Sequence, residues 1–143
     1  MNILIMTDLE GISGIYDREQ VTPSGYRFHE AREYMTADIN VCVEACKEAG
    51  ADKVYVRDCH GGSYTVIWEK LSPLADWCIL GNTSTDRFAG LEDCDGVILL
   101  GYHAMAGTKG AFLEHSMSSA SIQNYWINGN LAGETAIDAG IVG

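Results

Sequence analysis

The chain has 143 residues, of which 47% are hydrophobic and 20% are charged, a balance typical of a globular protein with an apolar core. Its net charge of −11 would repel phosphate backbones and anionic lipid surfaces, which argues against nucleic acid and membranes as partners. The first residues, MNILIMTDLEG, lack the basic start of a secretion signal. Five cysteines, an odd number without such a signal, predict reduced thiols and a cytoplasmic location.

The predicted elements alternate between strands and helices. An apolar run over residues 2–7 predicts a buried strand, and residues 11–28, rich in Gly, Ser and Pro, predict a loop. Apolar and small residues at helical spacing predict a helix over residues 30–49, which Gly50 ends. The remaining expected elements are a strand over 53–57, a short helix over 64–71, strands over 76–80 and 96–100, a strand pair over 124–132 around Asn128-Gly129, and a helix from Gly133 onward.

This alternation predicts an α/β fold with a mostly parallel sheet flanked by helices. We expect residues 1–143 to form a single α/β metal-binding domain. The last predicted helix has completed only about two turns at Gly143. We therefore expect the chain to be the N-terminal part of a longer polypeptide, with the domain incomplete at its C-terminal end.

Residues that can bind metal ions follow three of the predicted strands. Asp8 and Glu10 follow the first strand, Asp58 and His60 follow the second, and His103 follows the fourth. The carboxyl ends of parallel strands lie at one edge of a sheet, so these side chains should converge. The D-x-E and D-x-H spacings also place both members of each pair on the same side of an extended backbone. Histidine and carboxylate together form a ligand set typical of zinc.

Each residue alone also has a structural interpretation. An aspartate at a strand end can cap a loop, a histidine there can be a hydrogen-bonded structural group, and Glu134 can complement a helix dipole. Three of the four histidines, however, lie just after strands or in a Gly/Ser-rich segment: His60, His103 and His115. His29 is expected at the surface. This grouping favours a metal site, and the sequence lacks the GxGxxG, P-loop, HExxH, CxxC and GxSxG motifs of other sites.

With these residues located, the chain resembles the D-aminopeptidase family, peptidase family M55. The stretches that carry the resemblance occur in the family's order: TDLEGISG at 7–14, RDCHGG at 57–62, LGYHAMAGTKG at 100–110, LEHSMSSAS at 113–121 and INGNLAGETAID at 127–138. Members of that family continue past the position that matches Gly143.

The resemblance implies both the ligands and the chemistry. It implies two zinc ions per subunit, with Asp8 shared between them and His115 as the catalytic residue; the ligands it implies are Asp8, Glu10, His60, His103 and Glu134. It also implies a closed homo-oligomer. The implied substrate is a short peptide with a free amino terminus, with D-residues at that end among the candidates.

Such a site suits amide hydrolysis. Two metal ions about 3.5–4 Å apart would clamp the scissile carbonyl and lower the pKa of a water molecule to about 7. His115 would donate a proton to the leaving amine or stabilise the developing oxyanion.

Two other interpretations stay open. ILIMTDLEGIS resembles the D-x-D-G-T motif of Mg²⁺-dependent phosphatases of the haloacid-dehalogenase type, with Glu10 and Ile12 in place of the second Asp and the Thr. Those enzymes do not need histidines, so the three histidines favour the zinc hydrolase. The chain could instead be a non-catalytic domain that binds a metal or a small molecule.

Overall fold

The computed structural model describes residues 1–81 and 87–143. The elements follow one another as β1 (Asn2–Thr7), α1 (Arg18–Val21), α2 (Phe28–Glu48), β2 (Lys53–Asp58), β3 (Trp77–Ile79), β4 (Gly96–Leu100), β5 (Tyr125–Ile127), β6 (Asn130–Ala132) and α3 (Glu134–Val142). Short 3-10 turns occupy Trp68–Lys70 and Leu91–Asp93.

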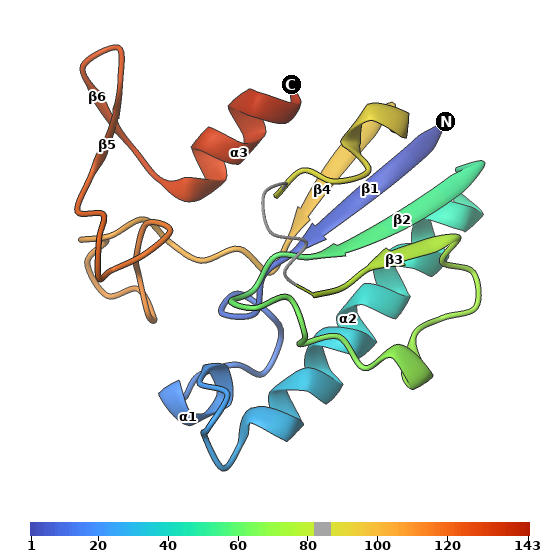
Figure 1. Cartoon of the computed structure of the whole chain (residues 1–143), viewed down its shortest axis with the longest axis horizontal. Coiled ribbons are helices and arrows are strands. Elements are labelled where there is room, and N and C mark those ends of the chain that lie inside the picture. The colour runs from blue at the N-terminus through green and yellow to red at the C-terminus, as the bar shows by residue number, and fades with distance from the viewer. Residues whose placement is uncertain (82–86) are drawn as a thin grey trace.

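Strands β1 to β4 form one parallel sheet in the order β3-β2-β1-β4, with β1 between β2 and β4 (Figure 1). Strands β5 and β6 form a separate antiparallel hairpin. The predicted α/β fold with a mostly parallel sheet is therefore confirmed. Its consequence for the site is that β1, β2 and β4 end side by side.

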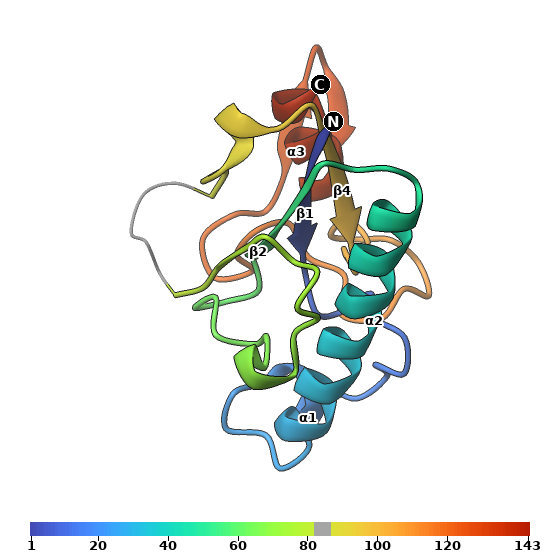
Figure 2. The same ribbon diagram turned by 90° about the vertical axis from the view of Figure 1, so that its right-hand side faces the viewer.

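Helix α2 covers one face of this sheet, and α3 lies on the other side, next to β4 (Figure 2). The two faces follow from the period-two pattern of β1. Ile5 packs toward α2, whereas Leu4 and Met6 point to the opposite face. On α2 the buried apolar stripe has helical spacing: Ala31, Met35, Ile39 and Val43.

Two element predictions were wrong. The predicted loop over 11–28 contains α1, a helix too short to show a period in the sequence, held by a capping box between Asp17 and Gln20. The predicted helix over 64–71 is reduced to a 3-10 turn at Trp68–Lys70, because the Asp58 carboxylate binds two backbone N–H groups at the start of that segment.

Within residues 1–81 and 87–143, no helix has the length and apolar character needed to cross a membrane. All five cysteines lie in this described part, and none forms a disulfide.

Candidate metal centre

Main-chain hydrogen bonds continue past the strands and join the loops that carry the predicted ligands. Asp8 N donates to Leu100 O at 2.8 Å, and Cys59 N donates to Thr7 O at 2.9 Å. Gly11 N donates to Gly101 O at 2.7 Å. The loops after β1, β2 and β4 therefore leave the sheet as one connected edge.

The loops after β1 and β4 touch through two glycines. A Cβ atom on Gly11 would lie 2.5 Å from Tyr102 O, which is closer than real contacts allow. Gly101 has φ +72°, and a Cβ there would collide with the Asp8 carbonyl oxygen. Any side chain at either position would push the Asp8 and His103 loops apart.

All six predicted site residues line one cavity of about 290 Å³ at this edge. Five of them come from the loops after β1, β2 and β4, and the sixth is the first residue of α3. The complete lining is Asp8, Glu10, Cys59, His60, Gly61, Arg87, His103, His115, Met117 and Glu134. The convergence expected from the parallel sheet is thus present in space.

Two histidine–carboxylate pairs form the walls of this cavity. His60 Nε2 lies 3.6 Å from Glu10 Oε1, and His103 Nε2 lies 3.2 Å from Glu134 Oε2. Asp8 Oδ2 lies 3.4 Å from the same nitrogen of His103. All five side chains are largely shielded from water, with side-chain exposures between 2% and 11%.

Each of the three site histidines has its Nδ1 atom engaged, and Nε2 of His60 and His103 faces the carboxylates of the cavity. The partners of Nδ1 are Thr65 Oγ1 at 3.0 Å for His60, Ala104 O at 3.0 Å for His103, and Leu113 O at 2.7 Å for His115. A carbonyl oxygen can only accept, so it fixes the proton of His103 and His115 on Nδ1. This arrangement leaves Nε2 available for a metal or a proton.

Asp58, which the sequence placed among the metal-capable residues, has a structural role. Its Oδ1 accepts from His60 N at 3.1 Å, and its Oδ2 accepts from Thr65 N at 2.6 Å and Val66 N at 3.1 Å. The carboxylate is fully buried, and this burial raises its pKa. Asp58 therefore orders the loop that presents His60, and it does not face the cavity.

The carboxylates of the cavity influence one another strongly. Burial and the nearby charge of Glu10 raise the pKa of Asp8 to about 7. Burial acts in the same direction on Glu10, but hydrogen bonding and charge from His60 lower its pKa to about 2. Burial disfavours the charged form of His103, yet Glu134, the Ala104 carbonyl and Asp8 raise its pKa to about 9.

Two carboxylate oxygens in this cavity are buried without a hydrogen-bond partner within the described residues: Asp8 Oδ2 and Glu10 Oε2. The 3.4 Å contact of Asp8 Oδ2 with His103 lacks hydrogen-bond geometry. A buried anionic oxygen without a partner is costly, and a bound cation would satisfy both atoms. Imidazole nitrogens and carboxylate oxygens are the donors that zinc accepts, so these residues fit zinc.

His115 is held directly against this ligand set. Its ring stacks on that of His103 with centroids 3.6 Å apart and planes at 16°. Its backbone N donates to Ala104 O at 3.2 Å. The ligand-capable atoms of His103, His115 and Glu134 lie within 4.8 Å of one another. This geometry suits either a metal ligand or a catalytic group, so the catalytic role of His115 stays a prediction.

Arg87 is a site residue that the sequence analysis missed. Its guanidinium pairs with Glu134 Oε1, and Nη2 also lies 2.8 Å from Asp138 Oδ2. Tyr102 OH donates to the same Asp138 oxygen at 2.9 Å. Arg87 therefore attaches α3 to the end of β4 and leaves Glu134 Oε2 facing His103. A signal was available, because Arg87 is the only arginine after Arg57 in an acidic chain.

A cavity that joins three histidines to three carboxylates at the carboxyl edge of a parallel sheet places the chain among α/β proteins with a zinc-compatible centre. The profile of peptidase family M55, D-aminopeptidase, matches residues 1–143, so the chain belongs to this family. The resemblance seen in the sequence motifs is thereby confirmed.

Two comparisons agree with this assignment. The chain is 33% identical over 145 residues to the D-aminopeptidase of Bacillus subtilis (strain 168), covering 100% of this chain and 52% of that protein. A solved structure described as the Zn-dependent D-aminopeptidase DppA from Bacillus subtilis, a self-compartmentalizing protease, superposes with a TM-score of 0.87 at 30% identity. That superposition covers 99% of this chain and 52% of the solved one. The chain thus spans about half the length of both relatives. Membership in the D-aminopeptidase family gives no support to the interpretation as a haloacid-dehalogenase-type phosphatase.

Proposed function

We propose that this chain carries the metal centre of a zinc-dependent aminopeptidase that cleaves short peptides through a two-metal site. The observation that carries the proposal is the pair of histidine–carboxylate walls around Asp8, His60 with Glu10 and His103 with Glu134. The descriptions of the relatives as D-aminopeptidase and Zn-dependent support the reaction and the metal. They also make peptides with a D-residue at the amino end the first substrates to test.

The proposed ligand assignment follows the two walls. Glu10 and His60 would hold one ion, and His103 and Glu134 would hold the other. Asp8 is the shared ligand, because a carboxylate has two oxygens, Asp8 Oδ2 lies 3.4 Å from His103 Nε2, and the charges of Glu10 and His60 also act on Asp8. Arg87 occupies Oε1 of Glu134, which leaves Oε2 facing His103, and Met117 N also donates to Oε2 at 2.8 Å.

Zinc ions bound in this cavity would polarise the scissile carbonyl and make a water molecule easier to ionise near neutral pH. The chain's own residues supply the rest of the chemistry. Because Nδ1 of His115 donates to Leu113 O, Nε2 is the nitrogen that can exchange a proton. It would accept a proton from the attacking water and then give it to the leaving nitrogen, or, once protonated, stabilise charge on the carbonyl oxygen. Asp58 and Thr65 keep the His60 ring in place during turnover.

The wider setting of the reaction is part of the same proposal. DppA is described as self-compartmentalizing, which supports a homo-oligomer for the complete protein. A cytoplasmic location rests on the five cysteines without a disulfide.

Elemental analysis and hydrolysis assays on the complete protein, purified without chelator, test the proposal. We expect two zinc ions per chain and turnover of dipeptides, with no turnover of phosphate monoesters. One zinc ion per chain would reject the two-metal site and retain the aminopeptidase. Turnover of phosphate monoesters, or metal binding without any hydrolysis, would reject the aminopeptidase itself.

A further inference from the structure

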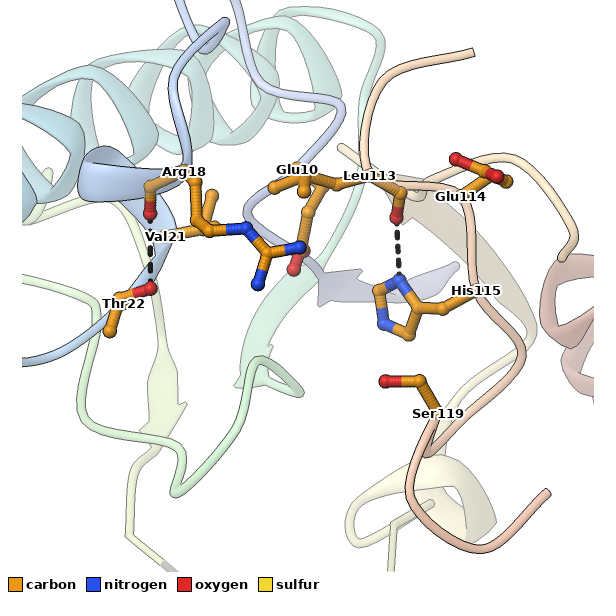
Figure 3. A pocket seen from close by; sticks show the side chains of 8 residues that line it. All are labelled: Glu10, Arg18, Val21, Thr22, Leu113, Glu114, His115 and Ser119. Atoms are coloured by element: carbon orange, nitrogen blue, oxygen red, sulfur yellow. Dashed lines mark hydrogen bonds between the residues drawn. The ribbon is translucent and has the colours of Figure 1, made fainter. Parts of the chain in front are cut away.

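A second cavity, of about 430 Å³, opens beside the metal centre. It shares Glu10 and His115 with the metal cavity and extends from them to α1. Arg18 lines it from α1, and Ser119 lines it from the segment after His115 (Figure 3). A molecule that enters the metal centre on the His115 side therefore has room to continue into this second cavity.

Arg18 differs from the other arginines of the chain. Arg27, Arg32, Arg57 and Arg87 each donate to a carboxylate or carbonyl oxygen. Within residues 1–81 and 87–143, the guanidinium of Arg18 has no hydrogen bond, ion pair or ring contact. Figure 3 shows it reaching from α1 across the cavity, in the direction of Glu10 and His115.

The backbone that carries Arg18 is fixed firmly. Asp17 and Gln20 form the capping box of α1, and Gln20 is fully buried. Arg27 joins α1 to α2 through an ion pair with Asp17 at 3.3 Å. Val21, also in α1, packs against the apolar core under the sheet. The unpartnered guanidinium is therefore presented by an anchored segment at a defined place in the cavity wall.

The position of His115 indicates which part of a substrate would occupy the second cavity. A proton donor for amide cleavage must lie within hydrogen-bond reach of the leaving nitrogen. His115 is the proposed donor and lines both cavities, so the leaving part of a substrate would extend beyond it toward Arg18. The leaving part of a short peptide ends in a carboxylate, which a planar guanidinium binds through two parallel hydrogen bonds.

We infer that this second cavity binds the leaving segment of a short peptide, and that Arg18 is a specificity-determining residue for its terminal carboxylate; this inference rests on the proposed aminopeptidase function. Glu114 also lines the cavity, but its carboxylate is exposed and Figure 3 shows it apart from the guanidinium. The substrate class is thereby narrowed to short peptides with a free carboxyl end.

The test compares D-alanyl-D-alanine with its C-terminal amide, using the complete zinc-loaded protein. We expect the wild type to prefer the free acid by about tenfold in kcat/KM, the lower part of the range for a charged hydrogen bond, because Arg18 is exposed. Arg18→Gln should lose this preference through a higher KM for the acid, with hydrolysis of the amide unchanged. Arg18→Lys should keep part of the preference, because it keeps the charge without the planar fork.

Lys109→Gln is the matched control, since Lys109 is an exposed cation that does not line the cavity, and it should leave the preference unchanged. Equal turnover of acid and amide by the wild type, or an equal loss of both in Arg18→Gln, would overturn the role of Arg18. If the wild type cleaves neither compound, the aminopeptidase proposal fails. Calorimetry with the same two compounds then tests Arg18. The role of Arg18 is supported if the wild type binds the acid more tightly than the amide and Arg18→Gln loses this difference. Equal binding of both compounds by the wild type rejects it.

Discussion

Helix α2 is attached to the sheet by apolar packing, whereas α3 is attached mainly through buried acidic side chains. The 21 residues of α2 bury an apolar stripe that includes Met35 and Ile39. The buried side of α3 instead carries two acids, Glu134 and Asp138, with residue exposures of 6% and 0%, whereas Ile141 is 55% exposed. The apolar composition of α3 is thus misleading about the face that it buries.

This difference separates the part of the molecule that stabilises the fold from the part that completes the site. Burial of a large apolar side chain such as Met35 contributes roughly 1.5–3 kcal/mol. Buried acids cost free energy unless they are paired, and those of α3 are paired with Arg87 and His103. Helix α3 is therefore positioned mainly by the site residues, with Val142 also packed against the cluster of Leu4 and Met6, whereas α2 is positioned by the core.

Among the substitutions that test this comparison, loss of a proposed metal ligand should have the largest effect. Replacing His103 with Ala removes the group that faces both Asp8 and Glu134, and replacing His60 removes the partner of Glu10. We expect each variant to lose zinc and activity together, with turnover reduced by more than about 10⁴-fold.

Zinc content and dipeptide hydrolysis measure this effect. His29→Ala in α2 is the control, because that side chain is 77% exposed and remote from the cavity lining. A His103→Ala protein with full zinc content would contradict the ligand assignment.

His115→Ala should have the next largest effect, and it should separate chemistry from metal binding. We expect the zinc content to stay at the wild-type level while turnover falls by about 10²–10⁴-fold, as for loss of a general acid or base. The same two assays measure it. Loss of zinc would make His115 a ligand, as its closeness to His103 and Glu134 permits; full activity would remove it from the mechanism.

Arg87→Gln and Asp138→Asn should weaken the centre by a smaller amount. Both changes disrupt the network that attaches α3 to the sheet edge, and neither removes a proposed ligand. We expect zinc affinity to fall by about 10- to 100-fold, the range for residues that orient metal ligands.

Competition with a chelator measures this affinity, with Arg27→Gln as the control, because Arg27 pairs with acids near α1 and does not line the cavity. Unchanged zinc affinity in both Arg87→Gln and Asp138→Asn would show that the position of Glu134 in α3 does not depend on this network.

A core substitution in α2 should affect the centre least. Met35 is fully buried, so Met35→Ala should lower the free energy of unfolding by about 2–5 kcal/mol. Zinc bound per folded chain should not change. Ile141→Ala in α3 is the comparison, because its exposed side chain should change stability by less than about 0.5 kcal/mol. Urea unfolding with parallel zinc analysis measures both, and a larger effect at Ile141 would reverse the comparison of the two helices.

The sequence predicted those features that depend on local pattern. The apolar runs of β1, β2 and β4 end at the expected polar residues, and the buried stripe of α2 has the expected spacing. The Asn128-Gly129 turn between β5 and β6 has positive φ at both residues, as this dipeptide favours. Because the sheet is parallel, correct strand ends were sufficient to bring Asp8, Glu10, His60 and His103 to one cavity. His115 and Glu134 lie away from the ends of these strands, and their roles were expected from the family resemblance.

The features that the sequence did not predict depend on contacts between distant segments. Asp58 has the spacing of a ligand, but it is turned away by backbone donors at Thr65 and Val66. Arg87 belongs to the centre only because α3 returns to the end of β4. Helix α1 has a capping box but is too short for a helical hydrophobic period. Its proposed role in substrate binding follows only from the cavity that Arg18 lines.

Gly11 and Gly101 determine how the centre tolerates mutation. No side chain separates the two loops at this point, so the separation of the Asp8 and His103 backbones depends on main-chain geometry and not on side-chain volume. Core residues beneath can be exchanged for others of similar size, with changes in stability but not in ligand spacing. A single methyl group at Gly11, by contrast, would displace the Tyr102 carbonyl and with it the neighbouring histidine. A redesign of this protein is therefore free to vary its interior but must retain these two glycines.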